Sequence, residues 1–186
     1  MAGRICTALT FTDETNTTGT TDAKYPLGTL RIEETSAAVG AETYRYVKFD
    51  NGSGNVAAVA GGVCYRGVTQ ARPWEVTSDV STVDSAFAAG IFQSVLTDAN
   101  YGWVKTKGYQ SNVKKHTGTG FAWVKGDYIY AFGSSTADQK AVNIKLAATT
   151  KVSGAELRKA LERGIGWAAA AVSSTTGTGA AYIDLE

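Results

Sequence analysis

His116, the single histidine of the chain, is the first candidate for chemistry, because imidazole is the commonest general base in enzymes. A nucleophilic serine or cysteine needs such a base beside it. His116 lies in the segment VKKHTGTG, where Lys114 and Lys115 disfavour its charged form and no carboxylate is near in sequence. The sequence therefore predicts a loop histidine and no nucleophilic triad.

Acidic side chains offer two further kinds of chemistry, acid–base catalysis and cation binding. Glu33 and Glu34 occupy adjacent positions of an expected strand, so they point to opposite faces and make poor partners for each other. Acids that are distant in sequence can still meet in a fold, so paired catalytic carboxylates stay an open alternative. The segment from Asp13 to Asp22 carries several oxygen ligands, but their spacing matches no calcium loop, and a polar loop is favoured.

The cysteine and glycine patterns likewise predict no bound group. Cys6 and Cys64 form no CxxC pair, and with one histidine they give no recognisable zinc site. A disulfide between them is the alternative to two separate buried thiols, which we favour in a chain that is not secreted. The segments 118–120 and 177–179 lack the strand–turn–helix context and the lysine that phosphate binding requires. We therefore predict a protein that is not an enzyme and has no catalytic residue, no cofactor and no metal.

Length and charge indicate one domain without a strong attraction to polyanions. The chain has 186 residues, 44% hydrophobic and 19% charged, and can bury one sizeable core. A formal net charge of +1 argues against nucleic acid and anionic membranes as partners. The first residues lack the apolar run of a signal peptide, and no run approaches the roughly 20 residues that span a bilayer. These features predict a soluble protein made in a cytoplasm.

Short β patterns bounded by Gly, Asn or Asp dominate the chain from residue 29 onward. In TYRYVKFD, alternation places Tyr44 and Tyr46 on one face and Val47 and Phe49 on the other. Apolar bulk on both faces suits a strand with one face in a core and the other partly covered. A hairpin follows in AAGIFQSVL, TDAN and YGWVKTKG, a strand, a turn and a second strand.

One helix and one arm complete the predicted fold. A capping box and an apolar stripe at helical spacing predict a short α-helix at about 154–163. The N-terminal segment 1–28, rich in Thr, Asp, Asn and Gly, reads as an extended or loop-like arm. The fold class predicted is mainly β, with a compact β-barrel or β-tulip-like domain over residues 29–186.

An aromatic pattern occurs twice, as YGWVK at 101–105 and FAWVK at 121–125. In strands, each copy places two aromatic rings on one face, so neighbouring copies could stack ring against ring. The plainer interpretation is that these rings simply fill a core. In either case the predicted aromatic framework consists of Tyr101, Trp103, Phe121, Trp123 and Trp167.

Charge is distributed unevenly along the chain. Residues 99–126 contain no acid but carry several lysines, whereas six acids crowd the N-terminal quarter. One interpretation is that the lysines protect exposed strand edges from aggregation. The other is a basic patch that docks on an acidic protein surface or on another copy. On the second interpretation the contact residues are Phe11, Asp13, Glu14 and Tyr25 of the arm and Lys105, Lys107, Lys114 and Lys115.

Several of these segments together resemble a known family. The stretch AAGIFQSVLTDANYGWVKTKG, followed by WVKGDYIY and a terminal GIGWAAAAVSSTTGTGAAYIDLE, is similar to the decoration, or cement, proteins of tailed-bacteriophage heads. Chains of that family often carry an AGI-type strand, a YGWV strand ending in Gly, a KGD turn and a final strand–turn–strand. The resemblance covers residues 88–186.

The resemblance implies a non-enzymatic structural protein of the virion. It would bind the outer surface of the assembled capsid, with the major capsid protein as partner, and stabilise the shell by bridging neighbouring subunits. Family members often form homo-oligomers, of which a trimer is favoured here and a dimer is the alternative. Synthesis in the cytoplasm of a bacterial host follows from the same resemblance.

Two other functions remain open at this point. Four Trp and nine Tyr on β-strands could form sugar-stacking platforms, which would make the chain a carbohydrate-binding or host-attachment module. The lysine stretch with its neighbouring aromatics could bind single-stranded nucleic acid, although the net charge near zero argues against this.

Overall fold

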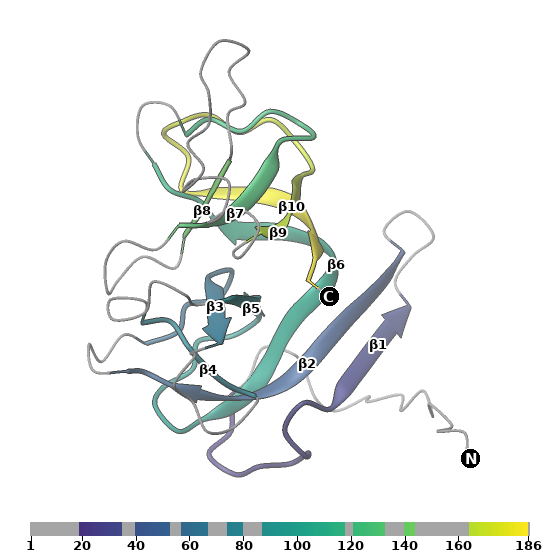
Figure 1. Ribbon diagram of the computed structural model, residues 1–186, viewed down its shortest axis with the longest axis vertical. Coiled ribbons are helices and arrows are strands. Elements are labelled where there is room, and N and C mark those ends of the chain that lie inside the picture. The colour runs from purple at the N-terminus through teal and green to yellow at the C-terminus, as the bar shows by residue number, and fades with distance from the viewer. Residues whose placement is uncertain are drawn as a thin grey trace.

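The computed structural model describes residues 19–34, 40–52, 57–66, 74–79, 87–117, 121–132, 140–143 and 164–185, and these residues form an all-β structure (Figure 1). In the first half of the chain the strands are β1 (Leu30–Glu34), β2 (Ala41–Asp50), β3 (Val63–Arg66), β4 (Glu75–Thr77) and β5 (Phe87–Phe92). In the second half they are β6 (Tyr101–Lys114), β7 (Tyr128–Phe132), β8 (Lys140–Asn143), β9 (Gly164–Ala168) and β10 (Thr178–Asp184).

Five of these strands close into a mixed barrel, in the order β2-β4-β3-β5-β6. Four neighbouring pairs are antiparallel, whereas β2 and β4 run parallel. Pairing of β6 with β2 closes the ring, with Tyr46 opposite Trp103 and Lys48 opposite Tyr101. The prediction of a mainly β fold with a β-barrel is therefore confirmed.

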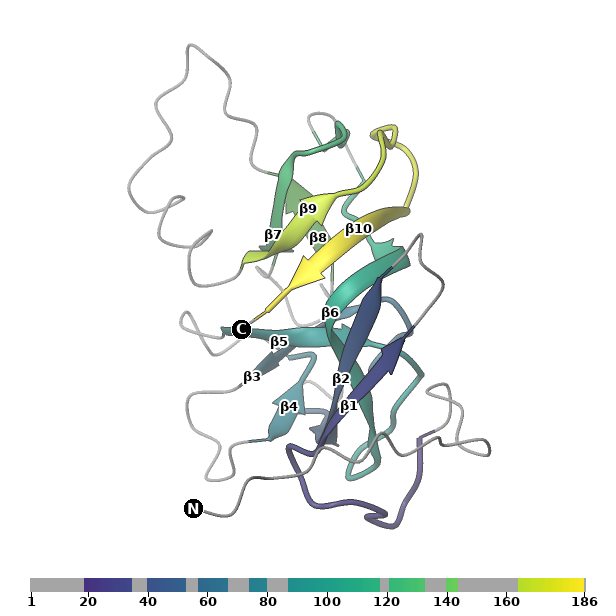
Figure 2. The same ribbon diagram turned by 90° about the vertical axis from the view of Figure 1, so that its right-hand side faces the viewer.

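The longest strand, β6, belongs to both parts of the molecule. Its first half completes the barrel, and its second half pairs with β10 over Lys107 to Lys114. From β10 the sheet continues through β9 and β7 to β8, above the barrel in Figure 1. On the other side, β1 pairs with the N-terminal part of β2, and Figure 2 shows β1, β2 and β6 side by side.

Alternation along β2 divides its side chains as predicted. Val47 and Phe49 point into the barrel, where they pack with Cys64, Phe92 and Leu96 in one buried cluster. The Cys64 thiol is free and buried, and burial raises its pKa, so it behaves as a small apolar side chain.

The opposite, outer face of β2 and β6 is covered by the chain itself. Tyr44, Tyr46 and Trp103 are buried there, beneath Tyr25 and Leu27. The segment that carries Tyr25 and Leu27 therefore packs on the barrel and belongs to the folded domain.

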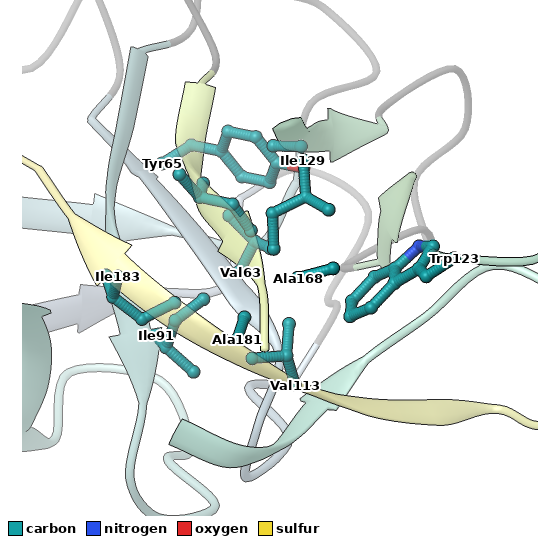
Figure 3. Packing of buried hydrophobic residues seen from close by; sticks show 11 residues of the cluster. Val63, Tyr65, Ile91, Val113, Trp123, Ile129, Ala168, Ala181 and Ile183 are labelled. Atoms are coloured by element: carbon teal, nitrogen blue, oxygen red, sulfur yellow. The ribbon is translucent and has the colours of Figure 1, made fainter. Parts of the chain in front are cut away.

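A second core lies between the barrel and the upper sheet (Figure 3). Val63, Tyr65 and Ile91 point outward from β3 and β5 and meet Ala181 and Ile183 of β10, all of them buried. Each large apolar side chain buried in this way stabilises the fold by roughly 1.5–3 kcal/mol. This core and the backbone of β6 make the barrel and the upper sheet one packed unit.

Several sequence expectations fall partly or wholly outside the described residues. The helix predicted at about 154–163 and residues 1–18 of the predicted arm lie outside them. From residue 19 the chain follows the barrel wall, where the Thr20 amide donates to the Tyr101 carbonyl at 2.9 Å and the Gly28 amide to the Tyr46 carbonyl at 2.8 Å. Within the described part of the chain, no helix has the length and apolar character needed to cross a bilayer.

Candidate functional site

Two of the four lysines expected to contact a partner are buried. The Lys105 ammonium lies 2.9 Å from a Glu42 carboxylate oxygen and donates to the Tyr109 carbonyl at 2.7 Å. The Lys115 ammonium donates to the carbonyls of His116 and Thr176 at 2.9 and 3.2 Å, and burial lowers its pKa. Both ammonium groups serve contacts inside the chain.

Lys105 is part of a buried polar network on the outer wall of the barrel. The Tyr44 hydroxyl donates to the second Glu42 carboxylate oxygen, and the Lys105 ammonium lies 5.2 Å from the centre of the Tyr44 ring. Burial, together with the hydrogen bond to the Glu42 carboxylate, raises the pKa of Tyr44. The network ties β2 to β6 where these strands close the barrel.

The other expected contact residues are spread along the molecule. Lys107 is exposed and pairs with Asp184 at 3.6 Å, and Lys114 is half-buried. Tyr25 packs its ring against Tyr46 and Trp103, with ring centres 5.3 and 5.5 Å apart. Phe11, Asp13 and Glu14 lie outside the described residues.

The predicted aromatic framework divides between separate clusters. Trp103 packs with Tyr46 and Tyr101, whereas Trp123 is buried in the core between the barrel and the upper sheet. The Phe121 ring contacts His116, with centres 4.6 Å apart. Stacking between the two copies of the repeat is therefore wrong, and the core-filling interpretation is confirmed for both tryptophans.

Trp167 belongs instead to an exposed row of rings on the upper sheet. Strand register places Tyr128 opposite Trp167, Trp167 opposite Tyr182, and Tyr182 opposite Tyr109, so the four side chains share one face of β7, β9, β10 and β6. Trp167 is 44% exposed and Tyr182 49%. We call Tyr109, Tyr128, Trp167 and Tyr182 the aromatic ladder.

Ring geometry and one glycine hold the aromatic ladder in place. The rings of Tyr109 and Tyr182 meet edge to face with centres 5.6 Å apart, and those of Tyr128 and Trp167 do so at 5.8 Å. Gly166, with φ of +143°, brings β9 so close to β10 that a Cβ would lie 1.8 Å from the Tyr182 carbonyl oxygen. This close approach sets Trp167 beside Tyr182.

A second exposed surface lies at one mouth of the barrel. The guanidinium carbons of Arg45 and Arg66 lie 3.9 and 4.4 Å from the centre of the Trp74 ring. Leu30 lies opposite Arg45 on β1, and Phe87 lies opposite Arg66 on β5, and both are exposed. We call Leu30, Arg45, Arg66, Trp74 and Phe87 the arginine mouth.

Side-chain alternation explains why the two arginines meet. Arg45 precedes the inward-pointing Val47 by two residues, and Arg66 follows the inward-pointing Cys64 by two. Because β3 runs antiparallel to β4 and β4 parallel to β2, both arginines reach the same end of the barrel. An arginine in the inward-facing set of a strand is the sequence signal that could have located this surface.

Across the described residues, no three or more His, Cys, Asp and Glu side chains come together as a metal site would require. No family model matches the chain, and no curated protein or solved structure shows a significant match to it. Function is therefore inferred from the two exposed surfaces and from the resemblance of residues 88–186.

Proposed function

We propose that this protein is a non-enzymatic structural component of a phage virion, which binds the outside of the assembled capsid and bridges neighbouring major capsid protein subunits. In this proposal it is made in the bacterial cytoplasm and acts as a homo-oligomer, with a trimer favoured over a dimer. The resemblance of residues 88–186 to capsid decoration proteins supports the proposal.

The structural observation that carries the proposal is the pair of exposed surfaces on one packed unit. The arginine mouth belongs to the barrel, and the aromatic ladder belongs to the upper sheet. Trp, Tyr and Arg are the residue types that contribute most to protein interfaces. A bridging protein needs two such surfaces held at a fixed separation, and β6 together with the core between barrel and sheet holds them so.

Rigidity gives this arrangement its energetic advantage. A protein that binds two neighbouring subunits stabilises only the assembled shell, by mass action on that state. When the first surface is bound, the second is presented at a high effective concentration. Aromatic side chains with few rotatable bonds lose little entropy on binding.

The direct test is to mix the purified protein with expanded, undecorated phage heads. We expect it to co-sediment with them and to raise the temperature at which they release DNA. Unexpanded shells serve as the matched control, because their subunits are differently spaced. The proposal is overturned if expanded heads of a panel of phages bind no protein, or if bound protein leaves their heat resistance unchanged.

The arm is tested by a deletion that ends before Thr20, whose amide donates to the Tyr101 carbonyl on the barrel wall. Removing residues 1–18 should weaken attachment at least about tenfold, or about 1.4 kcal/mol, while the thermal unfolding curve stays unchanged. Removing residues 1–28 instead would also remove Tyr25, which packs on Tyr46 and Trp103. A loss of capsid binding could then come from a loss of stability. Unchanged capsid binding by the shorter deletion would exclude a role of the arm.

The aromatic ladder favours a second candidate function, a carbohydrate-binding or host-attachment module. Exposed Trp and Tyr rings on a sheet offer apolar faces against which sugar rings stack, and the Lys107–Asp184 pair borders the row with hydrogen-bonding groups. The rings within each pair meet edge to face, so they form no flat platform. Such a surface suits a branched sugar better than a flat polymer.

A glycan array checks this second candidate. If it holds, Trp167→Ala should reduce binding to the best glycan at least about tenfold, because it removes the largest exposed ring of the aromatic ladder, and tenfold corresponds to about 1.4 kcal/mol. Val95→Ala, which shortens an exposed apolar side chain away from the ladder, is the control and should bind normally. An array without a positive glycan removes this candidate.

A further inference from the structure

We infer that the arginine mouth is a binding site for the carboxylates of an acidic polypeptide segment. This inference rests on the proposed function only for the identity of the partner, which would then be an acidic segment of the capsid protein. The preference for carboxylates follows from the residues themselves.

Within the described ranges, two positive charges lie against one indole and no acid compensates either of them. Among the described residues, neither Arg45 nor Arg66 forms an ion pair. Glu75, which follows Trp74 in the sequence, has its carboxylate bound by the Lys48 ammonium at 3.3 Å. Partial burial and then repulsion from Arg66 lower the pKa of Arg45, so an anion that contacts the free N–H edges of both guanidinium groups beside the indole would relieve an existing cost.

Both guanidinium groups are held so that binding an anion orders little that is not already ordered. Each guanidinium carbon lies over the Trp74 ring, at a distance that suits a flat contact, and the Arg45 Nη1 also donates to the Gly28 carbonyl at 3.2 Å. A guanidinium stacked by its flat face keeps its N–H edge for in-plane hydrogen bonds, the geometry that suits a carboxylate. Gly28 lets the Trp74 ring lie beside Arg45, because a Cβ at position 28 would lie 2.2 Å from the indole Nε1 of Trp74.

The neighbours of the arginines favour a polypeptide over a nucleic acid. Leu30 and Phe87 adjoin the two guanidinium groups and are 54% and 52% exposed, and Ile32 extends the apolar surface along β1. An acidic segment with interspersed apolar residues would fill both kinds of surface. A nucleic acid would leave the apolar side chains uncovered, and a net charge of +1 gives it little long-range attraction.

The test measures binding of a fluorescent peptide of alternating Asp and Leu to the full chain by anisotropy, at low and at physiological salt. We expect saturable binding that weakens as salt is added. Arg66→Glu should weaken binding at least about tenfold, the effect of losing a charge-assisted contact of about 1.5–3 kcal/mol. Arg66→Lys should retain part of the affinity, because it keeps the charge but loses the planar fork.

Lys107→Glu is the matched control, because it changes the net charge by the same amount at an exposed position outside the arginine mouth. Equal weakening by Arg66→Glu and Lys107→Glu would overturn the site, since only net charge would then matter. Tighter binding of oligothymidine than of the peptide, lost in Arg66→Glu, would overturn it in favour of nucleic acid. An absence of peptide binding would overturn it outright.

The same variants separate this inference from the proposed function. If Arg66→Glu loses the peptide but still decorates expanded heads, the carboxylate site exists and the capsid is bound through another surface. If the wild-type protein binds the peptide but no capsid, the carboxylate site stands and the proposed function fails. Unfolding curves of both variants should show a loss of no more than about 1 kcal/mol, since both side chains are exposed and Lys107 forms only a long surface pair with Asp184.

Discussion

Replacement of Lys105 by methionine is expected to lower the free energy of unfolding by about 3–5 kcal/mol, because it leaves a buried carboxylate without its cation. The Lys105 and Glu42 side chains are only 5% and 11% exposed, and their charged groups are 2.9 Å apart. Methionine fills a similar volume, so the loss measures the stranded Glu42 charge more than a cavity. Urea unfolding followed by tryptophan fluorescence gives the value.

The control for this prediction lies on the same strand. Lys107 also pairs with an acid, Asp184, but at 3.6 Å and with side chains that are 56% and 38% exposed. Lys107→Met should therefore cost no more than about 1 kcal/mol. Adding Glu42→Gln to Lys105→Met should recover part of the loss, because the amide keeps an acceptor for the Tyr44 hydroxyl without a charge. Similar losses for the two lysines would contradict the prediction.

Replacement of Gly166 by alanine is expected to destabilise the protein by more than about 4 kcal/mol, near the upper end of single substitutions. The new Cβ would lie 1.8 Å from the Tyr182 carbonyl oxygen, and no flexible side chain is there to give way. The φ of +143° is also one that alanine rarely adopts. Strands β9 and β10 would have to separate, which breaks the pairing of Trp167 with Tyr182.

Gly126→Ala isolates the part of this cost that comes from φ alone. Gly126 also has a positive φ, of +88°, but a Cβ there meets nothing within 4 Å. It should cost only about 1–2 kcal/mol. Thermal unfolding of the two variants distinguishes close approach from backbone strain, and a Gly166→Ala variant as stable as Gly126→Ala would show that β9 and β10 can move apart cheaply.

Local patterns in the sequence predicted the parts of this fold that depend on alternation within one strand. The two faces of β2 follow directly from TYRYVKFD, and the hairpin of β5 and β6 follows from two β patterns around TDAN. The YGWVK and FAWVK copies look alike in sequence, but only the first lies within a β-strand of the sheet, β6. Trp123 forms a single bridge to Val172 and enters a different core.

Contacts between residues of different strands could not be predicted from local sequence patterns. A count of lysines between residues 99 and 126 could not show that Lys105 meets Glu42, which is in another strand and far away in sequence. The arginine mouth combines side chains from β1, β2, β3, β5 and the residue before β4, and only the pairing of these strands around the barrel brings them together. The function and the partners stay predictions, which capsid binding and peptide binding test.

The continuity of β6 has a mechanical consequence. A pull applied between the barrel mouth and the upper sheet travels along the covalent backbone of one strand, and the hydrogen bonds to β2 and β10 on its flanks are loaded in shear, many at once. Such bonds must rupture together, whereas bonds at the end of a hairpin unzip one by one. The molecule is thereby built to resist tension along β6 far better than across it.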